Sequence, residues 1–265
     1  METPNTYIVA VAKSLILTDM EEGRITTSIS TLQSRLNNYF SNDVTKHFRF
    51  GSSVRETILP RKVDEGSDID YMVVFNNQYQ YKPATLLEKL RRFANAYYGR
   101  SEIYQSSPTM VLELNHIKFE LVPAYQLYLW YDSYYIPAPS SNYADWMSTN
   151  PSEIQNKVND ANNRYNYQIK RLIRLLKYWN VRNGKVYSSF ELENHIAGRS
   201  YWGCTSLEDY FYTAVSGLPI YSLPQYKKEK MIRLQETVAQ IKKDYYTNGY
   251  KYHAIDELEK LFPMP

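Results

Sequence analysis

The order of apolar and polar positions divides the chain into a first part that mixes helices with strands and a second part that is almost wholly helical. Thr6 to Asn38 has helical periodicity, with a break expected near Glu22-Gly23-Arg24. Pro83 to Tyr98 places apolar residues at helical spacing behind a first-turn proline. Short apolar runs bounded by turn-forming residues predict strands at 48–50, 71–75, 110–114 and 117–122.

The second part follows residues 131–151, whose proline, serine and asparagine content predicts a connector. Beyond it, Ser188-x-x-Glu191 and Thr205-x-x-Glu208 have the pattern of helix-capping boxes, and Gly198 and Gly217 suit helix ends. We therefore expect an α+β catalytic lobe over 1–145 and a helical lobe over 146–265.

Two aspartates open the predicted strand at 71–75. Asp68 and Asp70 stand two positions apart, and since side chains on a strand alternate with period two, both project from the same face. Paired carboxylates repel each other unless a cation lies between them, and their hard oxygens suit Mg²⁺. The alternative is a solvated strand end. Gly51-Ser52, just upstream, favours the metal site, because glycine allows phosphate to approach the backbone and serine offers a hydroxyl and an N–H.

A third carboxylate is expected from a hairpin that turns at Asn115-His116. Glu120 lies in the second strand, on the face it shares with Lys118, and an isolated buried carboxylate there would be costly. Glu113, one strand earlier, is the competing candidate. We favour Glu120 as the third carboxylate.

These residues resemble a known family. The Gly-Ser pair, the Asp-x-Asp strand and Glu120 followed by Leu-Val-Pro-Ala are similar to the nucleotidyltransferase superfamily that includes DNA polymerase β. The string T-I-L-P-R-K-V-D-x-x-S-D-I-D-x-M-V-V-F resembles bacterial cGAS/DncV-like nucleotidyltransferases, relatives of oligoadenylate synthase. The resemblance covers about residues 48–200 and implies a polymerase β-like mixed sheet lobe followed by a helical lobe. The third acid is commonly Asp in this superfamily, whereas here it would be Glu.

A predicted helix from about Asn162 to Val181 carries the second group of candidate residues. Its polar positions form one stripe, which in the simplest interpretation is a solvated face: Asn163, Asn166, Lys170, Arg174 and Lys177. The phrase L-I-R-L-L-K-Y-W resembles the family helix whose lysine holds the donor triphosphate, and that lysine corresponds to Lys177. By the same resemblance Ser189 would contact phosphate and Phe190 would stack on a base. The alternatives are Ser188 as a helix cap and Phe190 as a core residue.

The resemblance also implies a reaction. Asp68, Asp70 and Glu120 would bind two Mg²⁺ ions, or Mn²⁺ in their place, while Gly51, Ser52 and Lys177 would hold the phosphates of ATP or another nucleoside triphosphate. The product would be a cyclic or short linear oligonucleotide second messenger, made without a template, for bacterial antiphage signalling. A protein activator or a downstream effector would be a further partner. A transferase acting on a protein, a tRNA end or a small molecule, and a non-catalytic nucleotide-binding regulator, are the alternatives.

The composition of the chain limits which of these functions and settings are expected. The 265 residues carry 31 basic and 28 acidic side chains, a net charge of +3, which is not the profile of a protein that coats long nucleic acid. The single cysteine, Cys204, excludes an intramolecular disulfide, and the 4 histidines show no zinc-site spacing. The apolar stretch from Tyr7 to Leu17 is interrupted by Lys13, is too short to span a bilayer and has no basic segment before it. We expect a cytoplasmic protein without a membrane span.

Overall fold

The computed structural model describes residues 3–77, 80–99, 101–106, 109–127, 133–139, 142 and 144–265. These residues form two compact units, each described by itself. The sheet unit consists of 17–61 and 66–155, and the helical unit of 1–16, 62–65 and 156–265. This differs from the predicted division into 1–145 and 146–265, because the first helix packs with the C-terminal helices and the later boundary falls inside a helix.

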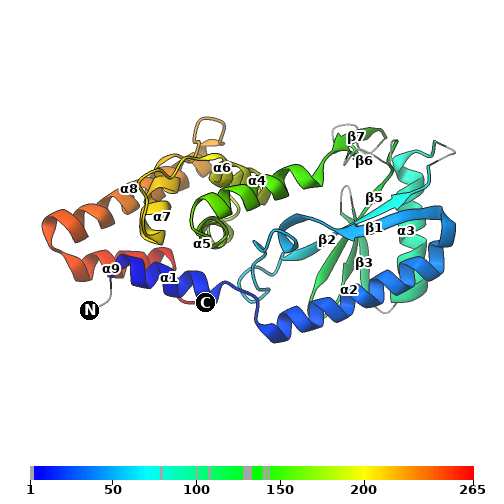
Figure 1. Ribbon diagram of the computed structural model, residues 1–265, viewed down its shortest axis with the longest axis horizontal. Coiled ribbons are helices and arrows are strands. Elements are labelled where there is room, and N and C mark those ends of the chain that lie inside the picture. Colours follow the sequence, from blue (N-terminus) through cyan, green and yellow to red (C-terminus); the bar gives the residue numbers. More distant parts are fainter. Residues whose placement is uncertain are drawn as a thin grey trace. The chain divides into compact units, whose positions relative to one another are not determined.

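The sheet unit is built on five strands in the order β1-β2-β5-β4-β3 (Figure 1). Their bounds are β1 Val44–Arg49, β2 Asp68–Phe75, β3 Glu102–Ser106, β4 Thr109–Glu113 and β5 Lys118–Ala124. β2 and β5 are parallel, whereas the other neighbouring pairs are antiparallel. The sheet is therefore mixed, as expected, and the predicted hairpin between β4 and β5 is confirmed.

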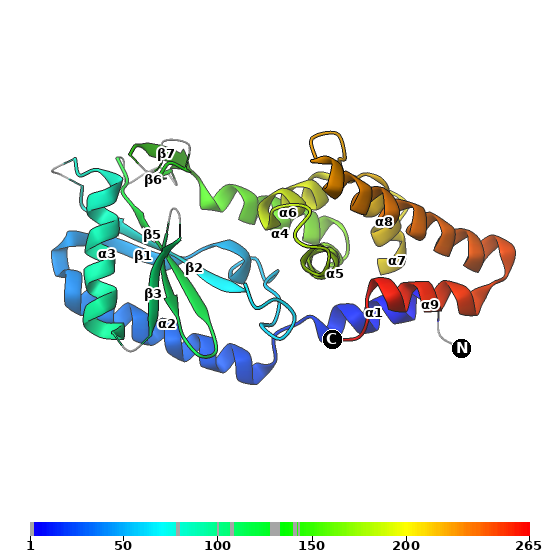
Figure 2. The ribbon, with the colours of Figure 1, turned by 180° about the vertical axis from the view of Figure 1, so that it is seen from behind.

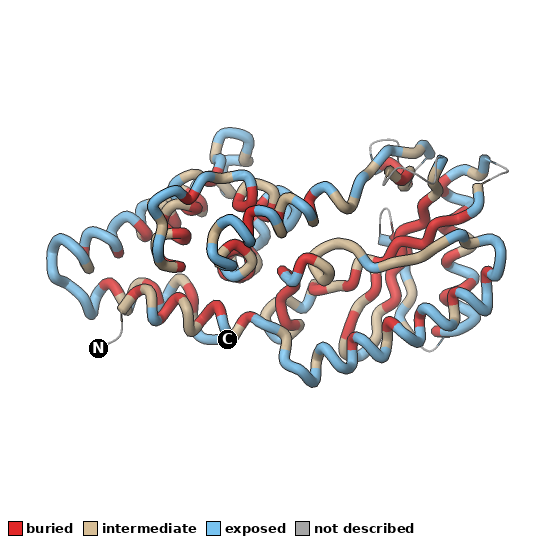
Figure 3. The backbone as a smooth tube through the Cα atoms, viewed as in Figure 1, coloured by how far each residue is buried: buried red, intermediate tan, exposed pale blue. Residues whose placement is uncertain are grey.

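Two helices, α2 (Asp19–Phe40) and α3 (Pro83–Tyr98), cover one face of this sheet (Figures 1 and 2). Their apolar residues form one core with the alternate strand residues Ile69, Tyr71, Val73, Phe119 and Leu121. The strands β2, β4 and β5 are largely buried (Figure 3), whereas β1 and β3 at the edges of the sheet are not. Residues of the opposite parity, among them Asp68 and Asp70, consequently project from the other face.

A second sheet pairs β6 (Tyr134–Pro137) with β7 (Trp146–Thr149). Met72, Val74 and Ala124 of the large sheet pack with Tyr134 on the face opposite α2 and α3. The prediction that 131–151 is only a connector is therefore wrong, since two of its segments pair as strands.

The helical unit contains α1 (Pro4–Ser14), most of α4 (Pro151–Arg164) and the helices that follow. These are α5 Ile169–Arg182, α6 Ser189–Gly198, α7 Leu207–Ser216, α8 Gln225–Lys243, a π-helical turn at Asp244–Asn248 and α9 Lys251–Leu261. α1 packs against α5, α7 and α9. The hydroxyls of Tyr7 and Tyr178 donate to the carbonyls of Phe262 and Pro263, both at 2.7 Å.

Helix caps explain where two predicted boundaries differ. Thr18 and Glu21 form a capping box that starts α2, so the break in the first helical stretch lies at 15–18 and not near Gly23. The box before α7 is formed by Ser206 and Asp209, one residue later than predicted, whereas the Ser188–Glu191 box is confirmed. α6 ends at Gly198, and Gly217 caps α7, as expected.

The long helix predicted from Asn162 to Val181 is interrupted between α4 and α5. Asn166 and Tyr167 there adopt φ angles of 50° and 59°, which are incompatible with a continuous α-helix. None of the helices in the described ranges is long and apolar enough to cross a bilayer.

Candidate active site

The register of two parallel strands brings the predicted acidic residues together. Asp70 of β2 lies opposite Glu120 of β5, and Asp68 lies opposite Lys118. Partners in register share a face of the sheet, so all four side chains project from the side that α2 and α3 leave uncovered. The structure thus assembles the three predicted carboxylates in one unit, together with a lysine.

Gly51 lies against one of these carboxylates. It follows β1, and the Phe50 N–H donates to the Asp70 carbonyl at 3.0 Å. The φ angle of Gly51 is +74°, and a Cβ atom placed there would overlap with the Asp70 carboxyl group. Only glycine combines this backbone conformation with so close an approach.

Ser52 lies in the turn that Gly51 begins. Its carbonyl accepts a hydrogen bond of 3.0 Å from the Thr57 N–H, and Thr57 is fully buried. The Gly51 carbonyl accepts from the Arg55 N–H at 3.3 Å. The turn is therefore fixed by its own backbone, and it holds Ser52 one residue from the position that contacts Asp70.

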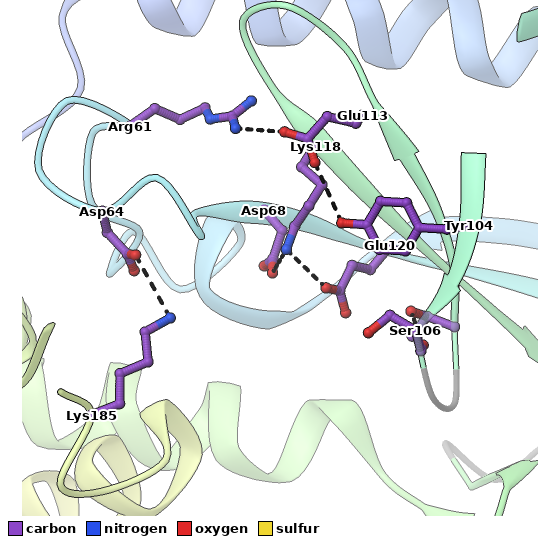
Figure 4. Close-up of polar contacts among 10 residues, drawn as sticks. Arg61, Asp64, Asp68, Tyr104, Ser106, Glu113, Lys118, Glu120 and Lys185 are labelled. Carbon is purple, nitrogen blue, oxygen red and sulfur yellow. Dashed lines mark hydrogen bonds and ion pairs between the residues drawn. The ribbon is translucent and has the colours of Figure 1, made fainter. Parts of the chain in front are cut away.

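Lys118 dominates the electrostatics of the acidic face, the face of the sheet from which Asp68, Asp70 and Glu120 project (Figure 4). The Lys118 Nζ atom lies 3.4 Å from Asp68 Oδ2 and 3.2 Å from Glu120 Oε1. Burial, together with the charge of Glu120, raises the pKa of Asp68 to about 6 against the opposing effect of Lys118. Burial disfavours the ammonium form of Lys118, but the two carboxylates outweigh it and hold the pKa of Lys118 above its ordinary value.

The donor set fits a hard divalent cation. Three carboxylates on two neighbouring strands supply only oxygen ligands, the type that Mg²⁺ prefers, and one positive group already lies between two of them. Within the described residues no group of three or more His, Cys, Asp or Glu is already arranged as a metal-binding cluster. The Lys118 ammonium group pairs with both Asp68 and Glu120.

Glu113, the competing candidate, has other partners. Its Oε1 atom accepts a hydrogen bond of 2.6 Å from Arg61, and the Tyr104 hydroxyl lies 3.5 Å from its Oε2 atom (Figure 4). Glu113 lies opposite Lys118 and not opposite Asp70. Position in the register therefore favours Glu120 as the third acid.

The remaining predicted residues belong to the helical unit. Lys177 of α5 is only 5% exposed and its Nζ atom lies 3.2 Å from Oε1 of Glu193, which is fully buried. Arg174 is also buried. The interpretation of the polar stripe as a solvated face is thus wrong for these two residues.

The segment that begins α6 combines a cap with two exposed residues. Ser188 is the N-cap, and its hydroxyl accepts from the Glu191 N–H at 3.2 Å. Ser189 is the first helical residue, and Phe190 is 58% exposed, so Phe190 is not part of the core. That Lys177, Ser189 and Phe190 act together with the carboxylates of the sheet unit stays a proposal.

Within the described residues, Lys118 is a candidate site residue that the sequence pattern did not single out. The signal was present, since Lys118 stands two positions before Glu120 in a strand and so shares its face. Its partnership with Asp68 depended on the pairing of β2 with β5, which the sequence alone did not reveal.

A mixed sheet with paired carboxylates beside a glycine turn, in a chain with a helical second unit, is the architecture of polymerase β-like nucleotidyltransferases. The family model of the Second Messenger Oligonucleotide or Dinucleotide Synthetase domain matches residues 1–162. The chain belongs to this family, and the resemblance to bacterial cGAS/DncV-like nucleotidyltransferases is confirmed. The predicted fold and, at the level of the family, the predicted enzyme class are confirmed as well.

Among curated proteins, the chain is similar to a probable cyclic nucleotide synthase of Bacillus cereus strain VD146, with 28% identity over 193 residues. The alignment covers 58% of this chain and 56% of that protein, so the chain spans little more than half the length of the relative it matches.

Solved structures show the same fold at low identity. Escherichia coli MS115-1 CdnC with ATP matches with a TM-score of 0.75 at 14% identity, covering 97% of both chains. Vibrio cholerae DncV cyclic AMP-GMP synthase with nonhydrolyzable GTP matches with a TM-score of 0.75 at 11% identity, covering 94% of this chain and 92% of that one. The complex of CdnC with HORMA-deltaN matches with a TM-score of 0.71 at 13% identity, covering 97% and 96%.

Proposed function

We propose that this chain joins nucleoside triphosphates into cyclic or short linear oligonucleotides, without a template and with release of pyrophosphate. The observation that carries the proposal is the opposed pair Asp70 and Glu120 on parallel strands, with Asp68 beside them and Gly51 against Asp70. Acidic oxygens next to a glycine turn are suited to hold metal-bound phosphate.

Asp68, Asp70 and Glu120 would hold Mg²⁺, with Mn²⁺ as a substitute. When bound, two such ions would neutralise the charge that builds up on the attacking and leaving oxygens of an in-line displacement. The carboxylates project from paired strands, so they could orient a metal-bound triphosphate with little movement of the backbone.

In the proposed reaction, an acceptor hydroxyl forms a bond from its oxygen to the α-phosphorus of the donor. The bond between that phosphorus and the oxygen bridging to the β-phosphate breaks, and pyrophosphate leaves. A carboxylate oxygen of Glu120 would accept the hydroxyl proton. A second transfer onto the linear intermediate would close a ring or extend the chain.

The other predicted residues would bind the donor. The Gly51 backbone, the Ser52 hydroxyl and the Lys177 ammonium would contact its phosphates, Ser189 would add a further phosphate contact, and Phe190 would stack on a base. Stacking on an aromatic plane contributes roughly 1–3 kcal/mol per base and tolerates any base. The exposure of Phe190 makes its ring available for this role within the helical unit.

The comparisons support ATP or GTP as substrate classes and a protein as a partner class, because CdnC is described with ATP and with HORMA-deltaN and DncV with a GTP analogue. We extend these partners to the present chain, with antiphage signalling as the setting, as part of the same proposal.

Pyrophosphate release from the four ribonucleoside triphosphates in the presence of Mg²⁺ tests the proposed chemistry. The matched control is Asp70→Asn, which removes one carboxylate charge and keeps the side-chain volume. We expect release by the wild type and none by the variant, with the variant folded. Triphosphate binding without release would support the non-catalytic alternative instead.

A further inference from the structure

We propose that Lys118 is the internal counter-ion of the acidic site, which neutralises Asp68 and Glu120 when metal is absent and which Mg²⁺ must displace in order to bind them. The inference rests on the proposed function, because it assumes that these carboxylates hold metal. It adds a residue that competes with the metal from within the protein.

The geometry that supports this role is fixed by the strands. Lys118 and Glu120 are neighbours on the same face of β5, and Asp68 lies opposite Lys118 on β2. The lysine side chain is 15% exposed, and the side chains of Asp68 and Glu120 are 26% and 22% exposed. Solvent therefore screens these contacts less than it screens an ion pair on the open surface. Figure 4 shows the ammonium group between the two carboxylates.

A carboxylate oxygen that pairs with the lysine ammonium group is not fully available to coordinate a metal ion at the same time. Asp68 Oδ2 and Glu120 Oε1 face the ammonium group, and a divalent ion held by both residues would have to take its place. One ammonium group leaves the three carboxylates with excess negative charge, so a divalent cation still binds favourably. Lys118 lowers that affinity and limits carboxylate repulsion in the metal-free protein. Tight metal binding would then need further negative charge, which a bound triphosphate brings.

Binding of Mn²⁺, followed by electron paramagnetic resonance as loss of the free-ion signal, tests the competition without relying on activity. The variants are Lys118→Gln, which removes the charge, and Lys118→Arg, which keeps it. The matched control is Lys89→Gln, because Lys89 forms a 2.9 Å ion pair with Asp43 in the same unit but away from the acidic face. We expect Lys118→Gln to bind Mn²⁺ about tenfold more tightly, since two partly buried ion pairs no longer oppose it. Lys118→Arg and Lys89→Gln should leave the affinity within about twofold of the wild type.

Thermal unfolding gives a second readout. In EDTA, Lys118→Gln should melt about 2–4 °C below the wild type, because the carboxylates lose their counter-ion. Added Mg²⁺ should raise its midpoint by more than it raises that of the wild type. If Lys118→Gln melts below the wild type in EDTA but Mg²⁺ raises its midpoint no more than that of the wild type, Lys118 is a purely structural residue.

A measurement on the wild-type sequence avoids any folding defect of the variants. Reductive ¹³C-methylation of lysines retains their positive charge and gives them NMR signals, which the Lys118→Arg and Lys89→Gln variants assign. Titration with Mg²⁺ should shift the Lys118 signal and leave the Lys89 signal in place. An unmoved Lys118 signal at saturating Mg²⁺ would overturn the inference.

The outcomes separate this inference from the proposed function. If the wild type binds Mn²⁺, Asp70→Asn does not, and Lys118→Gln binds with unchanged affinity, the metal site stands and the counter-ion role fails. If the wild type binds no Mn²⁺ with or without a nonhydrolysable triphosphate, the metal-dependent function itself fails, and the counter-ion role with it.

Discussion

Asp70 and Glu120 lie opposite each other across the parallel pair β2 and β5, although 49 residues separate them along the chain. Parallel neighbours need a crossover connection, and here α3, β3 and β4 supply it. The site is therefore anchored in two strands whose other face forms the core with α2 and α3. A change at either carboxylate should consequently affect chemistry more than folding.

The two glutamates of the hairpin are expected to differ sharply. Glu120→Gln should reduce pyrophosphate release to background, because it removes a metal-facing charge. Glu113→Gln should keep near-normal turnover and lose at most about 1 kcal/mol of stability, since the ion pair between Glu113 and Arg61 is partly exposed. Steady-state kinetics and urea unfolding of both variants measure this. The reverse pattern of activities would place the third acid on β4.

Gly51 should tolerate no side chain. Gly51→Ala is expected to abolish turnover and to lower the free energy of unfolding by more than about 2 kcal/mol. A positive φ angle alone costs roughly 1–2 kcal/mol, and the new Cβ atom would also displace Asp70.

Gly203 provides the control for this substitution, as its φ is +81° and nothing lies within 4 Å of the position that a Cβ atom would take. Gly203→Ala should show the backbone cost alone, with normal turnover. Equal loss of stability in both variants, with activity retained at Gly51→Ala, would mean that the contact with Asp70 is not required.

Lys177 should matter for stability whether or not it binds phosphate. Lys177→Ala leaves the fully buried Glu193 without this cation and should cost about 3–5 kcal/mol in urea unfolding. The double variant Lys177→Met/Glu193→Leu removes both charges and should regain much of that loss. If Lys177 also holds the triphosphate, the double variant will bind a nonhydrolysable triphosphate more weakly in calorimetry. Wild-type affinity in the double variant would restrict Lys177 to a structural role.

The metal-free protein should lose stability as the pH rises through the acid range. Burial raises the pKa of Asp68 to about 6 in the folded protein against 3.8 ordinarily, so the folded state binds more protons between these values. The stabilising contribution is therefore complete below about pH 3.8 and is lost as the pH rises through about 6. Melting temperatures in EDTA at pH 4.5 and 7, compared with those of Asp68→Asn, measure it. A difference between the two proteins that does not change with pH would contradict the assignment to Asp68.

Period-two alternation within short segments was enough to predict how the candidate carboxylates lie on their strands. It placed Asp68 with Asp70 on one face and Glu120 in a buried strand. It failed where long-range pairing or burial decides the outcome, because the role of Lys118 depends on the β2–β5 register. Likewise the burial of Arg174 and Lys177 at the end of the polar stripe depends on tertiary packing, which helical periodicity alone does not reveal. The break in the helix at 165–168 left no clear mark, since neither proline nor glycine stands there.

The central claim, that the chain makes oligonucleotides from free triphosphates, is tested most directly by its products. Purified protein is incubated with Mg²⁺ and the four labelled ribonucleoside triphosphates, treated with phosphatase and resolved by chromatography, with Asp70→Asn in parallel. We predict a labelled species of two or three nucleotides that needs no added nucleic acid and that resists phosphatase if it is cyclic. Label that appears only when an RNA, a protein or a small-molecule acceptor is supplied would contradict the claim and assign the chain to the transferases that modify such acceptors.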